Sequence, residues 1–304
     1  MKLWNNYFTP QTVDEALAVL SEHAGNARVI AGGTDLIVDL RADGGKHIQE
    51  ALVDITAISD LCNITVDGNV LTIGAGVPHA AIVKHDALQT GATCLVESCG
   101  VVGGPQVRNV GTLGGNVAHA LPAGDGTTSL VALDAEAEIV KDGQHQWVNI
   151  REMFLGPGKS LLNSTQDLLL GLRFQVTEAR EATAFKRIMR PQGVALPVLG
   201  CAVWIRLDES GEHYEEARVC LAPVAPVPIR AEAVENTLHG QPTNTETLDA
   251  AVEAAHTSLK PRTSKYRATK EYRAEMIEVL LRRTLSLAVQ RAQTGEAVPE
   301  GVGV

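Results

Sequence analysis

The stretch Val29-Ile30-Ala31-Gly32-Gly33-Thr34-Asp35-Leu36 decides how the first part of this chain folds. A short apolar run with strand-forming residues ends in two adjacent glycines, which tolerate positive φ and let another group approach the main chain. Successive backbone N–H groups in such a turn form a concave surface that binds anions, and the Thr34 hydroxyl adds a donor. The stretch therefore predicts either a phosphate-binding loop or an ordinary corner between a strand and a helix.

A second glycine pair occurs further along the chain, in Thr112-Leu113-Gly114-Gly115-Asn116. Two such loops could hold the two halves of a pyrophosphate between backbone donors. Asp125 follows, and it could accept hydrogen bonds from ribose or ribityl hydroxyls, as acidic residues do in dinucleotide sites. It could also cap a helix that begins near Thr127, and both roles remain open. Neither loop contains the Gly-x-Gly-x-x-Gly fingerprint of a Rossmann site.

Turn and periodicity signals divide the chain into mixed α and β regions. Asp-Gly pairs at 67–68 and 142–143 each lie between β-like runs and predict two hairpins. A capping box at 12–15 predicts a helix that ends near residue 25. Strands are expected over 195–205 and 218–221, and residues 231 to about 294 have helical periodicity. The pattern predicts an α+β domain to about residue 175, then a smaller strand-then-helix domain whose last residues fray.

The charge and hydropathy patterns exclude several classes of function. Lys plus Arg number 26 and Asp plus Glu number 36, which gives a formal net charge of −10. This balance argues against nucleic acid or an anionic membrane as the main partner. The N-terminal residues lack a signal-peptide pattern, and the charge-free apolar run at 193–205 is shorter than the ~20 residues that span a bilayer. We expect a cytoplasmic protein without a membrane span.

The cysteines indicate neither a disulfide framework nor a metal site. There are five, and no Cys-x-x-Cys occurs. Cys94 and Cys99 have the spacing that opens a plant-type iron–sulfur motif, but Val102 stands at the position of the third ligand. Gly158-Lys159-Ser160 resembles the end of a P-loop, yet the first glycine of that motif would fall at Met153. We therefore expect buried cysteines, no metal ligands and no P-loop.

Together these residues resemble the FAD-binding medium subunit of the molybdenum hydroxylases, a family that includes xanthine dehydrogenases, aerobic carbon monoxide dehydrogenases and 4-hydroxybenzoyl-CoA reductase. The two glycine stretches and Asp125 carry the resemblance. Further similar segments follow in the expected order along essentially the whole chain: Gln106-Val107-Arg108-Asn109, Ala184-Phe185-Lys186, Val224-Ala225-Pro226-Val227-Pro228-Ile229-Arg230-Ala231, Tyr272-Arg273 and Arg282-Arg283.

The resemblance implies a bound FAD whose pyrophosphate lies on residues 29–36 and 112–116. Asp125 matches the acidic FAD contact of the family, Leu169 an apolar neighbour of the flavin, and Lys186 a basic contact. Val102 falls where some members place an aromatic residue beside the isoalloxazine, which the side chain here cannot provide. No cysteine-rich insertion follows Asp125, so the 4Fe–4S cluster of the reductase branch is not expected.

The implied fold is α+β. A vanillyl-alcohol-oxidase-type (PCMH-type) FAD-binding domain is expected over residues 1–176, in two α+β subdomains that divide near residue 57. A small C-terminal α+β domain of antiparallel sheet plus helices is expected over 180–292, and a tail over 293–304.

The resemblance also implies an oxidoreductase that does not turn over an organic substrate alone. In this family a large subunit with a molybdenum cofactor hydroxylates the substrate, and a small subunit carries two 2Fe–2S clusters. FAD in the medium subunit then passes the electrons to an external acceptor. A dimer of heterotrimers is implied, and electron exit requires no catalytic side chain, so none is named. Two alternatives remain open: a stand-alone flavin oxidase or reductase of the same fold, and a non-enzymatic nucleotide-binding assembly module.

Overall fold

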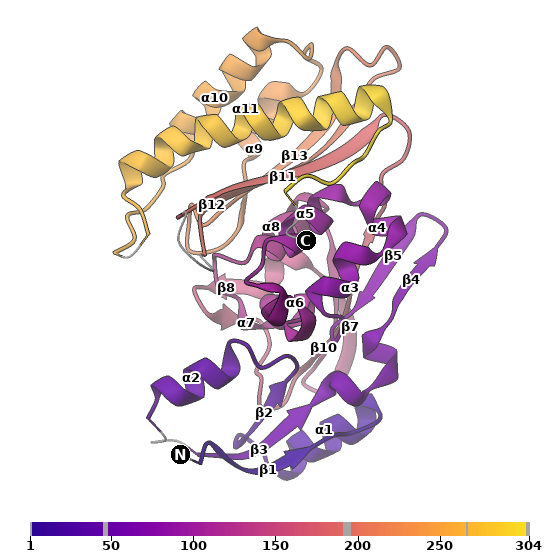
Figure 1. Ribbon diagram of the computed structural model, residues 1–304, viewed down its shortest axis with the longest axis vertical. Coiled ribbons are helices and arrows are strands. Elements are labelled where there is room, and N and C mark those ends of the chain that lie inside the picture. The colour runs from indigo at the N-terminus through magenta and orange to yellow at the C-terminus, as the bar shows by residue number, and fades with distance from the viewer. Residues whose placement is uncertain (1, 45–47, 191–195, 266, 302–304) are drawn as a thin grey trace.

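The computed structural model describes residues 2–44, 48–190, 196–265 and 267–301, and its elements stack in three tiers along the long axis (Figure 1). The first tier is a parallel sheet in the order β1-β3-β2. Its elements are β1 (Trp4–Phe8), α1 (Val13–Glu22), β2 (Ala27–Ile30), α2 (Leu36–Ala42) and β3 (Gln49–Asp54). Because parallel strands need crossover connections, α1 joins β1 to β2 and α2 joins β2 to β3. The Thr12 hydroxyl accepts from the Glu15 backbone N–H, which confirms the predicted start of α1.

The second tier is an antiparallel sheet in the order β4-β5-β10-β6-β7 with short helices beside it. Both Asp-Gly hairpins form as predicted, with Gly68 at φ +60° and Gly143 at φ +76°. Strand β10 lies between the hairpins and joins them. The elements are η1 (Ile55–Ala57), η2 (Ser59–Cys62), β4 (Ile64–Asp67), β5 (Val70–Gly74), α3 (His79–Lys84), α4 (Asp86–Gly91), α5 (Thr93–Gly100), α6 (Pro105–Val110), α7 (Leu113–His119), α8 (Asp125–Ala132), β6 (Glu136–Lys141), β7 (Gln144–Asn149), η3 (Ile150–Met153), the hairpin β8 (Phe154–Gly156) and β9 (Lys159–Ser160), and β10 (Leu168–Gln175).

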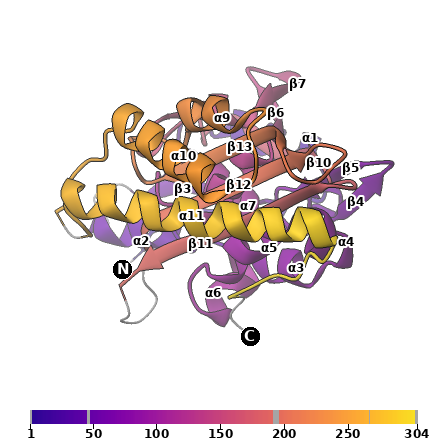
Figure 2. The same ribbon diagram turned by 90° about the horizontal axis from the view of Figure 1, so that it is seen from above.

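The third tier is an antiparallel sheet in the order β11-β12-β13-β14. Helices α9, α10 and α11 cover its outer face, as the view from above shows (Figure 2), and α5 and α8 contact its inner face. The elements are β11 (Glu181–Met189), β12 (Pro197–Leu207), β13 (Tyr214–Ala222), β14 (Ile229–Arg230), α9 (Glu232–Leu238), α10 (Thr245–Ser258) and α11 (Lys270–Thr294). The predicted strands and the predicted helical C-terminal part are confirmed, although residue 195 lies outside the described residues.

The charge-free run that ends at residue 205 is a strand buried on both faces. Ala202 and Trp204 join the core of the first two tiers, whereas Val203 and Ile205 join the separate core beneath α9–α11. Alternate residues of a strand point to opposite faces, so a strand between two cores is apolar throughout. Among the described residues, no helix is long and apolar enough to cross a membrane.

A buried ion pair links the second and third tiers. Glu97 of α5 accepts from Arg291 of α11 at 2.6 Å and from the Phe185 backbone N–H of β11 at 2.7 Å. The segment after α11 joins the same network, because the Glu300 backbone N–H donates to Glu97 at 2.8 Å and Arg291 donates to the Val298 carbonyl. The expectation that the last residues fray is therefore wrong for Val298 and Glu300.

Candidate functional site

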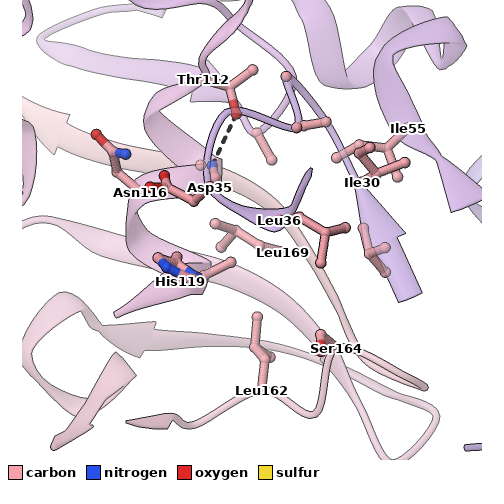
Figure 3. A pocket seen from close by; sticks show the side chains of 18 of the residues that line it. Ile30, Asp35, Leu36, Ile55, Thr112, Asn116, His119, Leu162, Ser164 and Leu169 are labelled. Carbon is pink, nitrogen blue, oxygen red and sulfur yellow. Dashed lines mark hydrogen bonds between the residues drawn. The ribbon is translucent and has the colours of Figure 1, made fainter. Parts of the chain in front are cut away.

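A cavity of about 220 Å³ lies where the first and second tiers meet (Figure 3). Both predicted glycine stretches contribute to it, together with a third wall from residues 158–169, of which only Leu169 was a predicted site residue. Gly158 and Ser160 of the rejected P-loop motif belong to that wall, but they lie on the β8–β9 hairpin and its turn. Leu36, Leu162 and Leu169 give the cavity an apolar side (Figure 3).

The first glycine stretch presents a row of free backbone donors. The N–H groups of residues 32–36 donate to no acceptor within the described part of the chain. Gly33 adopts φ +67°, the left-handed region that glycine enters without strain. All eight predicted residues, 29–36, line the cavity.

The second glycine stretch forms the first turn of α7. The Thr112 hydroxyl accepts from the Gly115 N–H at 2.9 Å and caps the helix (Figure 3). The Gly114 N–H donates to no acceptor among the described residues. Thr112, Gly114, Gly115 and Asn116 line the cavity, so the two stretches converge on one space.

The reason for glycine at two of these positions differs from the expected one. A Cβ at Gly32 would overlap the carbonyl oxygen of Val110, and a Cβ at Gly114 would overlap the backbone of Ala75. These glycines allow one main chain to pack against another, rather than admitting a ligand. A Cβ at Gly115 would meet only the Thr112 hydroxyl, at 3.0 Å.

Four predicted site residues do not line the cavity: Val102, Leu113, Asp125 and Lys186. Leu113 is fully buried in the core. Lys186 forms an ion pair with Glu300 of the C-terminal segment. The cavity therefore brings together the two glycine stretches and Leu169, whereas Val102, Asp125 and Lys186 lie outside it.

Asp125 is a buried carboxylate with one oxygen available. It is the first residue of α8, and the N-cap is Gly124, so the alternative that Asp125 caps this helix is wrong. One oxygen pairs with Arg187 of β11, whereas Oδ1 has no hydrogen-bond partner among the described residues. Burial raises the pKa of Asp125 to about 7, against the opposing effects of Arg187 and Arg267. No local pattern indicated Arg187 as the partner, because it lies 62 residues away along the chain.

His79 is a second buried polar group beside the glycine stretches. Its side chain is inaccessible to solvent, and its backbone N–H donates to the Gly111 carbonyl at 3.0 Å. Burial lowers its pKa to about 4; the nearby Asn116 amide opposes this shift and Arg108 adds to it. Neither ring nitrogen has a hydrogen bond of good geometry in the described structure. The ring is thus neutral at pH 7 and lies next to Gly111, immediately before the second glycine stretch.

The described residues contain no group of three or more His, Cys, Asp or Glu side chains that could hold a metal. Their arrangement suits a phosphorylated ligand instead. Backbone N–H groups from two turns can bind a diphosphate, the leucine side chains can contact a ring, and Asp125 Oδ1 can accept from a hydroxyl group.

Comparison with known proteins agrees with this geometry. Residues 3–174 match the family of the FAD binding domain in molybdopterin dehydrogenase, and residues 183–288 match the CO dehydrogenase flavoprotein C-terminal domain. The chain is 31% identical over 291 residues to the xanthine dehydrogenase FAD-binding subunit of Escherichia coli O157:H7, covering 94% of this chain and 97% of that subunit.

Carbon monoxide dehydrogenase of Hydrogenophaga pseudoflava is similar in both sequence and structure. Its medium chain is 28% identical over 285 residues, with 94% of this chain and 97% of that one covered. A solved structure of that enzyme, in a form lacking the Mo-pyranopterin moiety of the molybdenum cofactor, superposes with a TM-score of 0.88 over 96% of this chain and 99% of its counterpart. This chain therefore belongs to the family of FAD-binding flavoprotein subunits of the molybdopterin dehydrogenases.

Proposed function

We propose that this chain is the FAD-carrying electron-transfer subunit of a heterotrimeric molybdenum hydroxylase. The observation that carries the proposal is the convergence of the two glycine stretches on one cavity, where backbone N–H groups have no partner in the described chain. Residues 32–36 are half-buried and Gly114 is buried, so a ligand in the cavity can accept from donors that the chain itself leaves unpaired. The relatives named for FAD-binding and medium chains support FAD as that ligand.

In this proposal the chain binds and orients the cofactor. Residues 29–36 and 112–116 hold the diphosphate, and Leu169 contacts an apolar part of the ligand. Asp125 accepts from a hydroxyl through its free oxygen, and Val102 and Lys186 lie toward the flavin ring. Bound FAD supplies the capacity to take up electrons from iron–sulfur clusters and release them to an external acceptor. We assign the FAD-binding domain to 1–176, with a division near 57, the C-terminal domain to 180–292 and the tail to 293–304.

The partners in this proposal are a large molybdenum-cofactor subunit and a small subunit with two 2Fe–2S clusters, in a dimer of heterotrimers. Two such clusters need about eight thiolates, whereas this chain has five cysteines, all of them free and four buried. Free thiols also support a cytoplasmic location, because the cytosol keeps thiols reduced.

The flavin part of the proposal is tested on the isolated chain. Mild acid should release FAD, one per chain, and the apo-protein should bind FAD again. Flavin that stays attached after denaturation would contradict non-covalent binding, and recovery of FMN alone would contradict the diphosphate assignment.

The electron-transfer part is tested by turnover. The chain alone, shown by metal analysis to be free of partner subunits, should pass electrons from chemically reduced flavin to a dye. It should not oxidise aldehydes or purines until molybdenum and iron–sulfur subunits are added. Substrate turnover by the metal-free chain would favour the stand-alone flavoenzyme, and absence of any flavin binding would favour the assembly module.

A further inference from the structure

Arg28 is a cationic side chain of the cavity with no partner in the described structure. It lies on β2, is half-buried, and lines the cavity together with the first glycine stretch. Its Nε is inaccessible to solvent and makes no hydrogen bond. No ion pair or hydrogen bond joins this guanidinium to any residue that the structure describes. Buried N–H donors in folded proteins almost always have an acceptor, so the Arg28 Nε is a candidate donor to a ligand in the cavity.

The other charged side chains of the cavity have partners of their own or lie apart from Arg28. Asp167 is almost fully buried, and it accepts from the backbone N–H groups of Asn163 at 2.8 Å and Asp142 at 3.3 Å. Its carboxylate also lies 3.6 Å from the Lys141 ammonium. His119 faces Asp39 at 3.8 Å. Asp35, at the other end of the first glycine stretch, forms no ion pair with Arg28.

Arg28 directly precedes Val29, whose main chain is joined to the third wall of the cavity. The Val29 backbone N–H donates to the Ser164 carbonyl at 3.0 Å, and Ser164 and Thr112 lie at opposite ends of the cavity (Figure 3). Arg28 and Gly32 are four positions apart and the strand ends at Ile30, so their Cα atoms are at most about 13 Å apart at ~3.3 Å per residue. Arg28 therefore lies beside the part of a bound ligand that extends past the glycine stretches toward Ser164.

The direction of the dinucleotide follows from Asp125. Its carboxylate pairs with β11 of the third tier, whereas Arg28 belongs to the first tier, and the glycine stretches lie between them (Figure 1). A dinucleotide with its diphosphate on the glycine stretches thus directs one half toward Asp125 and the other toward Arg28. Under the proposed function, the flavin half takes the Asp125 end.

We infer that Arg28 recognises the adenine of FAD. This inference rests on the proposed function and names a specificity residue within it. A guanidinium is planar, stacks on aromatic faces and donates N–H groups in its own plane, while adenine offers a flat face and ring-nitrogen acceptors. Because FMN ends at one phosphate and has no adenine, Arg28 makes the site selective for FAD over FMN.

The test compares ligands that share or lack the adenine. Apo-protein of the full chain is titrated with FAD, FMN and ADP for wild type, Arg28→Leu, Arg28→Lys and the control Arg41→Leu, which changes an exposed charge on α2. We expect Arg28→Leu to weaken FAD and ADP binding about 10- to 100-fold, as for a charged hydrogen-bond donor, and to leave FMN binding unchanged. Arg28→Lys should fall between, because an ammonium cannot stack in the same way, and Arg41→Leu should match wild type.

A measurement on the wild type keeps the inference testable if a variant folds poorly. Etheno-FAD, which alters only the adenine ring, should bind wild type more weakly than FAD. Equal affinity of wild type for both ligands would overturn the inference. Equal losses of FAD and FMN binding in Arg28→Leu would also overturn it, since they would indicate a structural or phosphate-binding role. A wild-type chain that binds no FAD at all would instead refute the proposed function.

Discussion

Replacing Glu97 by alanine removes a carboxylate that joins four segments of the chain. The Glu97 and Arg291 side chains are 1% and 3% exposed, so the remaining guanidinium would stay in a buried position. The substitution also takes the acceptor from the backbone N–H groups of Phe185 and Glu300. No other carboxylate is paired with Arg291 in the described structure to replace it.

The expected loss of unfolding free energy is about 5 kcal/mol. Removing one member of a buried pair costs about 3–5 kcal/mol, because the other charge is left uncompensated. Arg291 keeps its hydrogen bonds to the carbonyls of Thr183, at 2.8 Å, and Val298, which places the charge term toward the lower end. Each of the two backbone donors left without an acceptor adds roughly 1 kcal/mol.

Urea unfolding followed by circular dichroism gives the free energy, and hydrogen exchange at the Phe185 amide reports the local effect. The matched control is Glu278→Ala, which removes a carboxylate that is 43% exposed and lies one helical turn from Arg282. That control should cost no more than about 0.5 kcal/mol.

The double variant Glu97→Ala/Arg291→Ala completes the cycle. Because it leaves no buried charge unpaired, it should lose less stability than the sum of the two single variants. Additive losses, or a loss below about 1 kcal/mol for Glu97→Ala alone, would refute the reasoning.

Two further predictions concern the glycine stretches and the buried side chain of His79 beside them. Gly32→Ala should destabilise the apo-protein by about 1–3 kcal/mol or more, because its Cβ would overlap the Val110 carbonyl. Gly115→Ala should cost less, and thermal unfolding of both apo-variants decides; similar melting temperatures would contradict the packing argument. His79 takes up a proton near pH 6.5 in the unfolded chain but only near pH 4 in the folded one. The contribution of His79 to the free energy of unfolding is therefore fully present above pH 6.5. It falls by about 3 kcal/mol as the pH drops to 4. Urea unfolding of His79→Gln should lack this component, and parallel pH profiles for the two proteins would show that His79 does not cause it.

The sequence by itself determined the features that depend on neighbouring residues. The Asp-Gly pairs specified both hairpins, because only certain residues tolerate the positive φ of such turns. The capping box specified the start of α1 for a similarly local reason. The two glycine stretches indicated two walls of the cavity, since unpaired N–H groups at a turn follow from the local sequence of the turn. Together with the later segments, they were enough to indicate the family.

Only the tertiary structure decided which distant residues meet. Arg187 forms an ion pair with Asp125, 62 residues away in the sequence, and Arg291 forms one with Glu97, 194 residues away. The tertiary structure also brought residues 158–167 to the cavity beside the predicted Leu169, and it left Arg28 lining the cavity without a partner among the described residues. The physical reason is range: turn and capping preferences act over a few residues, whereas a pair contact depends on how whole sheets and helices pack. For the same reason the sequence located Gly32 and Gly114, but only packing showed that the carbonyl of Val110 and the backbone of Ala75 exclude any larger side chain there.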